Sequence, residues 1–471
     1  MHPKNKKWGC EVASHIINDP VHRVMAFNED EKKLIKSFID SELFQRLRRI
    51  KQLGCGDLIF PGAVHTRFNH CIGASYLAKR LHNQLILDLA PKKKEAEKNV
   101  IMIAALLHDV GHGPFSHAFE KLFDKKYENA FQKKELIKKC KISHDKEWLK
   151  KFIDEFNYKD VSVTAKDIKA VLLDKKDEYL SDIISSQLDV DRMDYLLRDS
   201  HFCGVPYGKI DLKWLMSCIT TIPVDEKIRL GISKKGIGAL EHYITARRLM
   251  TRNIYYHGKK NAAEYYIREF LSGLIENHPS EIKGSMLDNF LQEYSKYSDK
   301  IISISGDDKQ KEEKGKFINK AFQYYKNITD DDVWFYIKNL ANKAKDQKSF
   351  VIASRLMKRE LPDYYQLNPS RIAKATMIVS EEIDNLKKND RWMIHLDTLD
   401  FVSYKRDKEP IYVKEGESGC DIYHESTILN LLSDRNEETH YLYLDKYLNE
   451  KKRNRLLSAL KDGYCLYSPE V

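Results

Sequence analysis

Hydrophobic residues recur at helical spacing along much of the chain, and polar stretches separate these segments. Apolar side chains three and four positions apart predict helices over residues 31–52, 66–85, 188–199 and 239–275. A continuous apolar run over residues 100–107 predicts a buried helix. The Gly-His-Gly-Pro sequence that follows shortly after must end or bend this helix. We therefore expect a mainly α-helical core.

The pattern changes near residue 365, where short β-rich runs alternate with turns. The runs predicted as strands are residues 392–396, 401–404 and 411–413. A final helix is expected near residues 446–460. This change predicts two units, a helical core over residues 1–345 and a smaller α+β lobe over residues 346–471.

Two charged stretches interrupt the helical pattern. Residues 92–98 and 297–320 are rich in lysine and glutamate, so we expect loops there. The whole chain has 80 Lys and Arg against 70 Asp and Glu, a formal net charge of +10. Because the excess is diffuse, it fits a polyanionic partner such as a nucleotide or nucleic acid, and equally an ordinary solvated surface.

The sequence also bears on the cellular compartment. No apolar run reaches the roughly 20 residues that a membrane span requires, and no apolar segment of a secretory signal follows the N-terminus. The eight cysteines include no CxxC pair, which argues against a zinc ribbon and gives no disulfide framework. We therefore expect a cytoplasmic protein with no membrane partner.

Ionisable side chains cluster directly after the apolar run. His108, Asp109, His112 and His117 fall within ten residues. Imidazole and carboxylate groups at the end of a buried helix are costly unless they are paired or bound to a cation. His108 and His112 share a face if the helix continues that far. The stretch is therefore a candidate metal site.

Two other segments supply further candidate ligands. His70 and Asp191, with His108 and Asp109, give two imidazoles and two carboxylates, a mixed set suited to Mn, Fe, Zn or Mg. A cation bound there would acidify water and polarise a phosphorus atom. Arg67 lies at the start of the helix that carries His70, where a phosphate is favoured.

Two more groups of side chains have candidate roles. His112 and His117 are close in sequence to Glu120, and a histidine backed by a carboxylate is the usual composition of an acid–base pair. Asp191, Tyr195 and Asp199 recur every four residues on one helical stripe. This stripe is either a functional face or an ordinary solvent-facing one, and the spacing alone fits both.

Longer strings around these residues resemble a known family. They are similar to the dNTP triphosphohydrolase branch of the HD-domain metallophosphohydrolases, which includes the sterile-alpha-motif/HD enzymes and their bacterial relatives. The strings are residues 17–22, 44–54, 60–63, 67–70 and 108–117. The resemblance is close over residues 15–215 and weaker to about residue 340. It implies an HD-domain helical bundle core and a smaller α+β C-terminal lobe.

The resemblance also implies a role for individual side chains. The metal ligands would be His70, His108, Asp109 and Asp191, with Mg accompanying the nucleotide. The groups nearest the triphosphate and the chemistry would be His112, His117, Glu120 and His144, although the family usually has Asp in place of Glu120. The substrate-binding residues would be Gln52, Leu53, Arg67, Arg192, Tyr195, Asp199 and Tyr325.

Within that set the implied roles differ. Arg67 and Arg192 would bind phosphates, and Tyr195 would disfavour a ribose 2′-OH. Gln52 and Asp199 would bind the 3′-OH, and Tyr325 would contact the base. The implied reaction is attack of water on the α-phosphorus, which releases a deoxynucleoside and inorganic triphosphate.

The resemblance further implies assembly and regulation. Relatives form tetramers when activating nucleotides bind at subunit interfaces, so we expect a homo-oligomer, dimer or tetramer, and activation by GTP or a dNTP. The activator-binding residues would be Asn18, Asp40, Gln45 and Arg48. His15 stands where a Lys is expected, and no N-terminal interaction domain precedes the catalytic region.

Two other functions remain open at this stage. An HD-type phosphodiesterase or nuclease would act on cyclic nucleotides, oligonucleotides or single-stranded nucleic acid, and the basic surface suits it. A nucleotide sensor would bind without turnover, although a degenerate sensor is expected to lose a metal ligand. The residues do not choose between control of dNTP pools and defence against phage.

Overall fold

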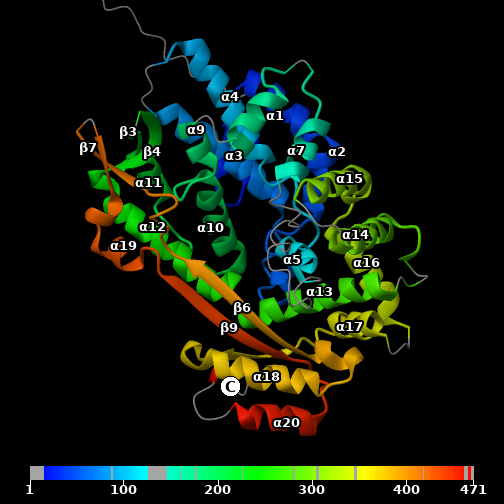
Figure 1. Ribbon diagram of the computed structural model, residues 1–471. Helices are drawn as coiled ribbons and strands as arrows, with labels where there is room; N and C mark the ends of the chain where they lie inside the picture. The colour runs from blue at the N-terminus through cyan, green and yellow to red at the C-terminus, as the bar shows by residue number, and fades with distance from the viewer. Residues whose placement is uncertain are drawn as a thin grey trace, which may run out of the picture.

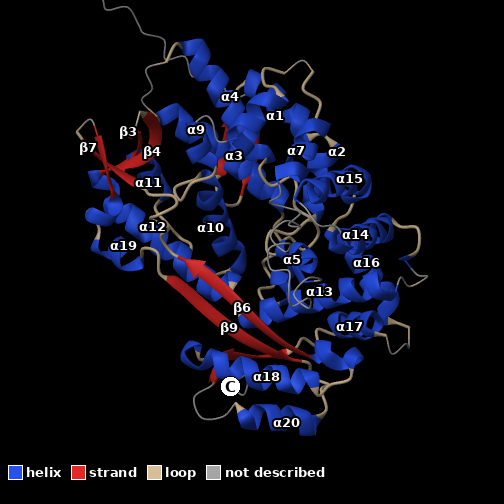
Figure 2. Ribbon diagram, in the orientation of Figure 1, coloured by secondary structure: helices blue, strands red, loops and turns tan. Residues whose placement is uncertain are grey.

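The computed structural model describes residues 15–85, 89–125, 146–159, 161–174, 178–224, 226–277, 279, 282–303, 307–343, 347–416, 418–460 and 465–467. Helices build most of the molecule, and the sheets are small (Figures 1 and 2). The predicted fold class, a mainly α core with a smaller α+β lobe, is confirmed.

The helical body begins with a short hairpin, β1 (His15–Asp19) and β2 (Arg23–Phe27). Its first helices are α1 (Glu29–Ile39), α2 (Glu42–Gln45), α3 (Arg67–Gln84), α4 (Pro91–Leu107), α5 (His117–Lys125), α7 (Lys146–Glu155), α8 (Ala165–Lys169), α9 (Glu178–Ile184), α10 (Val190–Cys203) and α11 (Leu212–Cys218). The later helices are α12 (Ile237–Met250), α13 (Gly258–Asn277), α14 (Met286–Ser303), α15 (Asp307–Tyr325), α16 (Asp330–Ala341) and α17 (Lys348–Met357). Short 3₁₀ or π turns are η1 (Arg46–Arg49), η2 (Gly54–Leu58), η3 (Ala170–Asp174), η4 (Lys234–Gly236) and η5 (Thr251–Tyr255).

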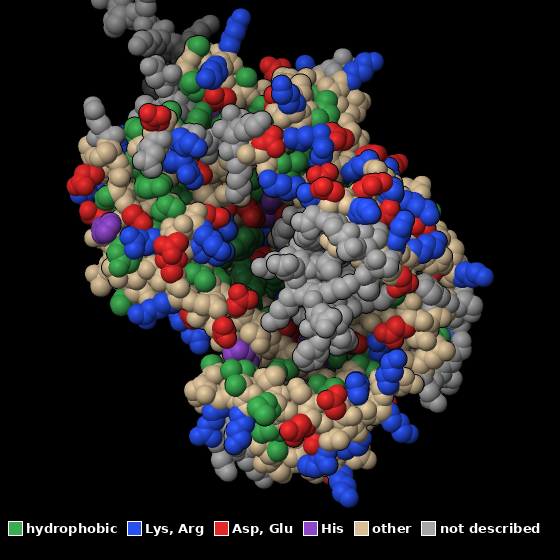
Figure 3. Space-filling view, viewed as in Figure 1, with side chains coloured by type: hydrophobic (Ala, Val, Ile, Leu, Met, Phe, Trp, Pro, Cys, Tyr) green, Lys and Arg blue, Asp and Glu red, His purple; other side chains and the backbone are tan. Residues whose placement is uncertain are grey.

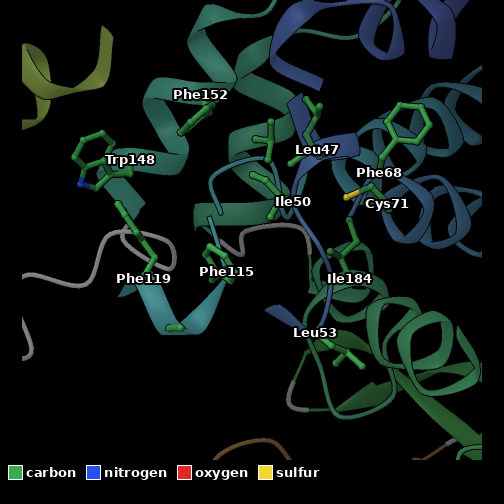
Figure 4. Packing of buried hydrophobic residues seen from close by; sticks show 14 of the residues in the cluster. Leu47, Ile50, Leu53, Phe68, Cys71, Phe115, Phe119, Trp148, Phe152 and Ile184 are labelled. Carbon is green, nitrogen blue, oxygen red and sulfur yellow. The ribbon is translucent and has the colours of Figure 1, made fainter. Parts of the chain in front are cut away.

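Helices α3, α4 and α10 form the centre of the body. α3 packs against both α4 and α10, and their buried faces belong to one large hydrophobic cluster. The predicted buried helix is confirmed, since every residue from Ile101 to Leu107 is buried at the end of α4. Figure 4 shows Leu47, Phe68 and Phe115 within this cluster. The ends of these three helices are therefore fixed by a close-packed interior.

The predicted helix over residues 31–52 is broken. α1 ends at Ile39, and Asp40 is its C-cap. Ser41 starts α2 by accepting a hydrogen bond from the Phe44 N–H at 3.3 Å. Serine at an N-cap begins a new helix without changing the apolar spacing, so the periodicity did not reveal the break.

The described residues of both predicted loops are helical, so both predictions were wrong. Residues 92–98 are the first turns of α4, with Pro91 at its start. Lys98 is buried there and lies 2.9 Å from a Glu31 carboxylate oxygen. A run of charges on one side of a helix resembles a loop in the sequence, because the apolar face appears only further along.

The second charged stretch, residues 297–320, belongs mostly to α14 and α15. Lys320 of α15 lies 2.9 Å from a carboxylate oxygen of Glu293 on α14. On the buried side, the Tyr297 and Phe317 rings stack 4.5 Å apart. The charges are therefore the outer face of a helical hairpin.

The long helix predicted over residues 239–275 is two helices, α12 and α13, separated by the π turn η5. The Tyr256 N–H donates to the Thr251 carbonyl at 2.8 Å, which is the π spacing. Such turns shift side chains out of helical register and recur at functional sites. Here the shifted residue is Tyr255, whose hydroxyl reaches the site described below.

In the described residues, the chain from Asp363 onward adds one sheet, completes a second and adds three α-helices. One sheet has the order β10-β5-β9-β6 and the other the order β3-β4-β7-β8. The strands are β3 (Ile219–Val224), β4 (Lys227–Ser233), β5 (Asp363–Leu367), β6 (Ile394–Val402), β7 (Tyr412–Glu415), β8 (Ser418–Asp421), β9 (Asn436–Leu444) and β10 (Cys465–Tyr467). The helices and turns are η7 (Pro369–Arg371), α18 (Ile372–Asp384), η8 (Lys388–Met393), η9 (Ile422–His424), α19 (Thr427–Leu432) and α20 (Glu450–Ala459).

These two sheets occupy different places. In Figure 1, α18 and α20 lie at the far end of the molecule beyond the β6–β9 ribbon, and they share a separate small hydrophobic cluster. β7, by contrast, pairs in parallel with β4 of the preceding part of the chain. The C-terminal segment is thus interleaved with the body, and the boundary at residues 345/346 stays a prediction.

Candidate metal and phosphate site

Three helices bring the four predicted metal ligands together. His70 lies in the first turn of α3, His108 and Asp109 directly follow α4, and Asp191 lies in the first turn of α10. The His70 Nε2 atom is 3.0 Å from Asp191 Oδ1 and 3.3 Å from His108 Nε2. Asp109 Oδ2 is 3.7 Å from His70 Nε2. Side chains from three distant segments thus converge on one point.

Both histidines present the same ring nitrogen because the other nitrogen is occupied. His70 Nδ1 is 2.8 Å from a carboxylate oxygen of Asp194. His108 Nδ1 lies 2.7 Å from the Ala105 carbonyl, to which it donates. A donor bond at Nδ1 leaves the Nε2 lone pair facing the centre, which is the usual orientation of a metal-binding histidine.

Asp194 is itself anchored from the other side. The Arg198 guanidinium donates to both of its oxygens at 2.9 Å, and His22 Nε2 is 2.6 Å from Oδ1. Gly73 on α3 permits this approach, since a Cβ atom at Gly73 would lie only 1.9 Å from Asp194 Oδ1. Asp194 and Arg198 are fully buried, so the orientation of His70 is built into the α3–α10 packing.

The electrostatics of the cluster favour a positive charge at its centre. Burial lowers the pKa of His70, but hydrogen bonds to Asp191 and Asp194 outweigh it and raise that pKa to about 10. Burial raises the pKa of Asp109, yet Arg67 and the surrounding histidines hold it well below its usual range. Two Nε2 lone pairs beside two ionised carboxylates form a donor set that fits a divalent cation.

Arg67 and Ser116 lie next to Asp109 at the side of the ligand cluster. Arg67 is buried, forms an ion pair with Asp109, and donates from Nε to Ser116 Oγ at 2.9 Å. A guanidinium held beside the carboxylate of a metal site is well placed for a phosphate oxygen. The predicted phosphate role of Arg67 is therefore compatible with its position.

His112 is not on the same helical face as His108, because α4 ends at Leu107. Turns replace the helix there, with the His112 N–H donating to the Asp109 carbonyl at 3.1 Å. These turns nevertheless place His112 Nε2 3.7 Å from a Glu120 carboxylate oxygen.

His117 Nδ1 lies 3.2 Å from the other oxygen of Glu120. His117 is exposed, whereas His112 and Glu120 are buried. The structure thus joins both histidines through one carboxylate beside the metal ligands. His144 lies outside the described residues.

The side of the cluster next to α10 carries the predicted sugar-pocket residues. The Tyr195 ring lies 6.4 Å from the His70 ring and 5.9 Å from the Tyr255 ring. Asp199 is held between His65 Nε2 at 2.7 Å and the Tyr255 hydroxyl at 2.9 Å. The predicted stripe of Asp191, Tyr195 and Asp199 therefore lines the site, and Asp199 is buried.

Gln52 and Leu53 lie at the turn between η1 and η2. The Gln52 Oε1 atom is buried and has no hydrogen-bond partner among the described atoms, and Leu53 is buried. Figure 3 shows a hollow at the centre of one face, with histidine and acidic side chains at its back.

Two predicted substrate residues are engaged elsewhere. Arg192 is bound to the Asp189 carboxylate and to the Ser186 carbonyl. Tyr325 is fully buried in an aromatic cluster, and its hydroxyl donates to the Gly111 carbonyl at 2.9 Å. Among the described residues, neither side chain hydrogen-bonds to a metal ligand, and their roles toward phosphate and base stay predictions.

The predicted activator residues lie around the break after α1. Gln45 Nε2 donates to the Ile39 carbonyl at 2.8 Å, and Arg48 Nε donates to Gln45 Oε1 at 2.7 Å. Asp40 borders a surface depression that is also lined by Lys33, Lys36, Ser37 and Ser41. Asn18 lies in the β1–β2 hairpin, opposite Val24.

The sequence interpretation missed several residues that the structure places at the site. They are His22, His65, Asp194, Arg198, Arg247 and Tyr255. Arg247 is buried, and its Nη1 atom has no hydrogen-bond partner in the described part of the chain. Burial raises the pKa of Tyr195 to about 12, while Arg192 and Arg247 lower it, so Arg247 lies close enough to act on Tyr195. For Asp194, Arg198 and Arg247, a charged residue inside a predicted core helix was the available signal.

The segment that carries these residues is similar to known proteins. Residues 67–199 match the HD domain, a stretch that begins at Arg67 and ends at Asp199. The chain therefore contains an HD domain over these residues. Among the described residues of this HD-domain protein, no helix is both long and apolar enough to cross a membrane.

Relatives of the HD-domain protein share part of its length. The uncharacterized protein YwfO of Bacillus subtilis is 35% identical over 263 residues, 56% of each chain. The deoxynucleoside triphosphate triphosphohydrolase SAMHD1 of Homo sapiens is 29% identical over 281 residues, 54% of this chain and 44% of that protein. The matched region thus spans about half the length of the curated relatives. The predicted resemblance to this family is confirmed.

A solved structure extends the similarity. A phosphohydrolase from Bacteroides thetaiotaomicron aligns with a TM-score of 0.68 and 25% identity, over 92% of this chain and 100% of that one. The HD-domain protein therefore has the fold of an HD phosphohydrolase over most of its length.

The pKa of His70 leads to a prediction about metal binding. His70 is protonated up to a pKa of about 10 in the metal-free protein, and a cation must displace that proton. This proton stabilises the folded, metal-free protein. Its contribution is fully present below the ordinary pKa of 6.5 and is lost as the pH rises through about 10.

We therefore expect the apparent Mn²⁺ affinity to fall about tenfold for each unit that the pH is lowered between roughly 9 and 7. Isothermal titration in two buffers of different ionisation enthalpy would detect the released proton. An affinity independent of pH over this range would contradict the assignment of His70 as a ligand.

Proposed function

We propose that this HD-domain protein is a metal-dependent dNTP triphosphohydrolase, which converts a dNTP and water to a deoxynucleoside and inorganic triphosphate. The observation that carries the proposal is the position of Tyr195 and Asp199 beside the ligand cluster. Tyr195 lies beside His70, and Asp199 is fixed next to it by His65 and Tyr255. Homologues named as deoxynucleoside triphosphate triphosphohydrolases support the same substrate class.

The side chains divide the work of this reaction. A divalent cation bound by His70, His108, Asp109 and Asp191 would supply Lewis acidity toward water and the α-phosphate. Arg67 neutralises the phosphate charge. Asp199 and Gln52 orient the sugar, and the buried Oε1 of Gln52 accepts from the 3′-OH.

A separate pair of residues, His117 and Glu120, carries out the proton transfer. The water oxygen bonds to the α-phosphorus as the bond to the 5′-oxygen breaks. His117, backed by Glu120 at 3.2 Å, gives a proton to the departing 5′-oxygen. The attacking water loses one proton to solvent, from which the exposed His117 is reprotonated.

Product analysis by chromatography tests this proposal. The protein, with Mn²⁺ or Mg²⁺, is given each dNTP alone and then all four with GTP. We expect deoxynucleoside and intact triphosphate. Cleavage of cyclic or single-stranded substrates without any dNTP turnover would favour a phosphodiesterase, and tight nucleotide binding without either activity would favour a sensor.

The sugar specificity gives a further prediction. Replacing Tyr195 with alanine removes the ring that faces the sugar, so ribonucleotides should become substrates. We expect the kcat/KM ratio of dATP to ATP to fall by about tenfold to a hundredfold. Tyr195→Phe keeps the ring and should keep the discrimination. If Tyr195→Ala discriminates as well as the wild type, Tyr195 does not select the sugar.

Regulation and assembly are part of the same proposal. Asn18, Asp40, Gln45 and Arg48 bind an activating GTP or dNTP, a role supported by the lysine-lined depression next to Asp40. The protein works as a homo-oligomer in the cytoplasm. Turnover only in the mixture that contains GTP would support the activator site, and equal turnover of single dNTPs would argue against it.

A further inference from the structure

A buried carboxylate outside the ligand cluster joins two segments of the site. Asp330, the first residue of α16, is only 2% exposed. Its Oδ1 accepts from the Phe115 N–H at 2.7 Å, and its Oδ2 accepts from the Lys51 N–H at 3.0 Å. One carboxylate thus binds the backbone just before Gln52 and just before Ser116–His117.

Capping of α16 does not explain this carboxylate. Thr329 is the N-cap, and the Thr329 N–H donates to Asp332 in a capping box at 2.7 Å. Burial raises the pKa of Asp330 to about 7, although the hydrogen bonds from the two backbone N–H groups lower it. A buried carboxylate is costly, so its position is best explained by the two backbone groups that it holds.

The loop that Asp330 holds is strained. Phe115 and Ser116 both have positive φ angles, 53° and 51°, in a region that side chains with a Cβ rarely adopt. Such conformations persist only where surrounding contacts determine them. Ser116 Oγ also donates to the Lys51 carbonyl at 3.2 Å, so the same two segments are joined a second time.

Gly54 allows the two segments to approach. Its φ is +53°, and a Cβ atom there would lie 3.0 Å from the Phe115 carbonyl oxygen. Gln52 and Leu53 lie between Lys51 and Gly54, so they are held at both ends against the loop that precedes His117.

The turn that carries Asp330 is anchored to the same loop by other contacts. Tyr325 donates to the Gly111 carbonyl at 2.9 Å. Arg46 donates from Nε to the Ile328 carbonyl at 3.0 Å and from Nη1 to the Val110 carbonyl at 3.4 Å. The α15–α16 turn is therefore a rigid base for Asp330.

We propose that Asp330 is a positioning residue that fixes the separation between the sugar-binding segment at Gln52 and the proton-transfer loop at His117. This role rests on the proposed triphosphohydrolase function. Asp330 itself touches no substrate, and it acts through the backbone of Lys51 and Phe115.

Asp330→Asn tests the role. The amide accepts from one N–H and presents its own N–H₂ to the other, so one of the two tethers is lost. We expect kcat for dATP to fall about a hundredfold and the dATP-to-ATP selectivity to fall with it. The Mn²⁺ affinity should stay unchanged, because Asp194 and the Ala105 carbonyl hold His70 and His108.

Asp331→Asn is the matched control. Asp331 is the next residue, is exposed, and lies 3.4 Å from Arg49, so the same chemical change there should alter neither rate nor selectivity. Wild-type kcat and selectivity in Asp330→Asn would overturn the proposal. A fall in Tm with unchanged kcat and selectivity would likewise assign Asp330 to stability alone.

A second variant and a substrate-free measurement complete the test. Gly54→Ala should push the same segments apart and reproduce the loss of selectivity while Asp330 is intact. Hydrogen exchange of the Lys51 and Phe115 amides should accelerate in Asp330→Asn. If the wild type does not hydrolyse dNTPs, the proposed function fails, but this exchange still reports the tether: unchanged exchange would overturn it and faster exchange would support it.

Discussion

His108→Ala should abolish metal binding and dNTP hydrolysis together. His108 Nε2 lies 3.3 Å from His70 Nε2 and 3.4 Å from Asp191 Oδ1, so its removal leaves three of the four donors. Alanine also adds no new charge, and the change is confined to the end of α4. We expect the bound-metal content measured by atomic emission to fall to background, and product formation to fall below detection.

His242→Ala is the matched control for this experiment, since His242 lies on α12 and is exposed. It should bind metal and turn over substrate as the wild type does. Full activity of His108→Ala would show that the metal site is wrongly assigned. Metal bound normally with activity lost would instead make His108 a catalytic group and not a ligand.

The sequence predicted the helices that carry the ligands because each has a strong local signal. The apolar run before His108 and the spacing along α10 are set by burial against α3, and burial gives the helical period directly. The resemblance to the HD family then linked His70, His108 and Asp191, which lie in three segments that no local pattern connects. The convergence of these segments is what the structure adds.

The parts that were missed depend on contacts between distant segments. Asp194 is three residues after Asp191 and resembles an ordinary helical acid in the sequence, yet it is fully buried by His70, His22 and Arg198. Tyr255 reaches Asp199 only because a π turn interrupts the predicted helix. Pairing across packed helices has no periodicity, so composition and spacing do not reveal it.

The predicted helix boundaries were wrong for a different reason. Residues 92–98 resemble a loop because most of their charges face solvent, from a helix whose buried apolar residues begin only at Ile101. The break at Asp40 was invisible because Ser41 restarts the apolar pattern in phase. Local capping chemistry decides such points, and the periodicity averages over it.

Asp194→Asn should weaken metal binding, although Asp194 is not itself a metal ligand. The His70 Nδ1–H bond to a carboxylate raises the basicity of the ring and fixes its tautomer, and loss of such a partner typically costs about tenfold to a hundredfold in metal affinity. The variant should also lose about 3 kcal/mol of unfolding free energy, because Arg198 is buried with Asp194 and then retains only Asp19. Mn²⁺ titration and urea denaturation measure the two effects.

These two effects separate orientation from folding. Asp384→Asn, an exposed aspartate 3.5 Å from Arg391, makes the same chemical change and should move neither value. If excess Mn²⁺ restores turnover in Asp194→Asn, the lost activity reflects weakened binding by a misoriented His70. If turnover stays low at saturating metal while the fold is intact, Asp194 also acts on the bound site, since ligand basicity tunes the acidity of a metal-bound water. Unchanged affinity would mean that the α3–α10 packing alone orients His70.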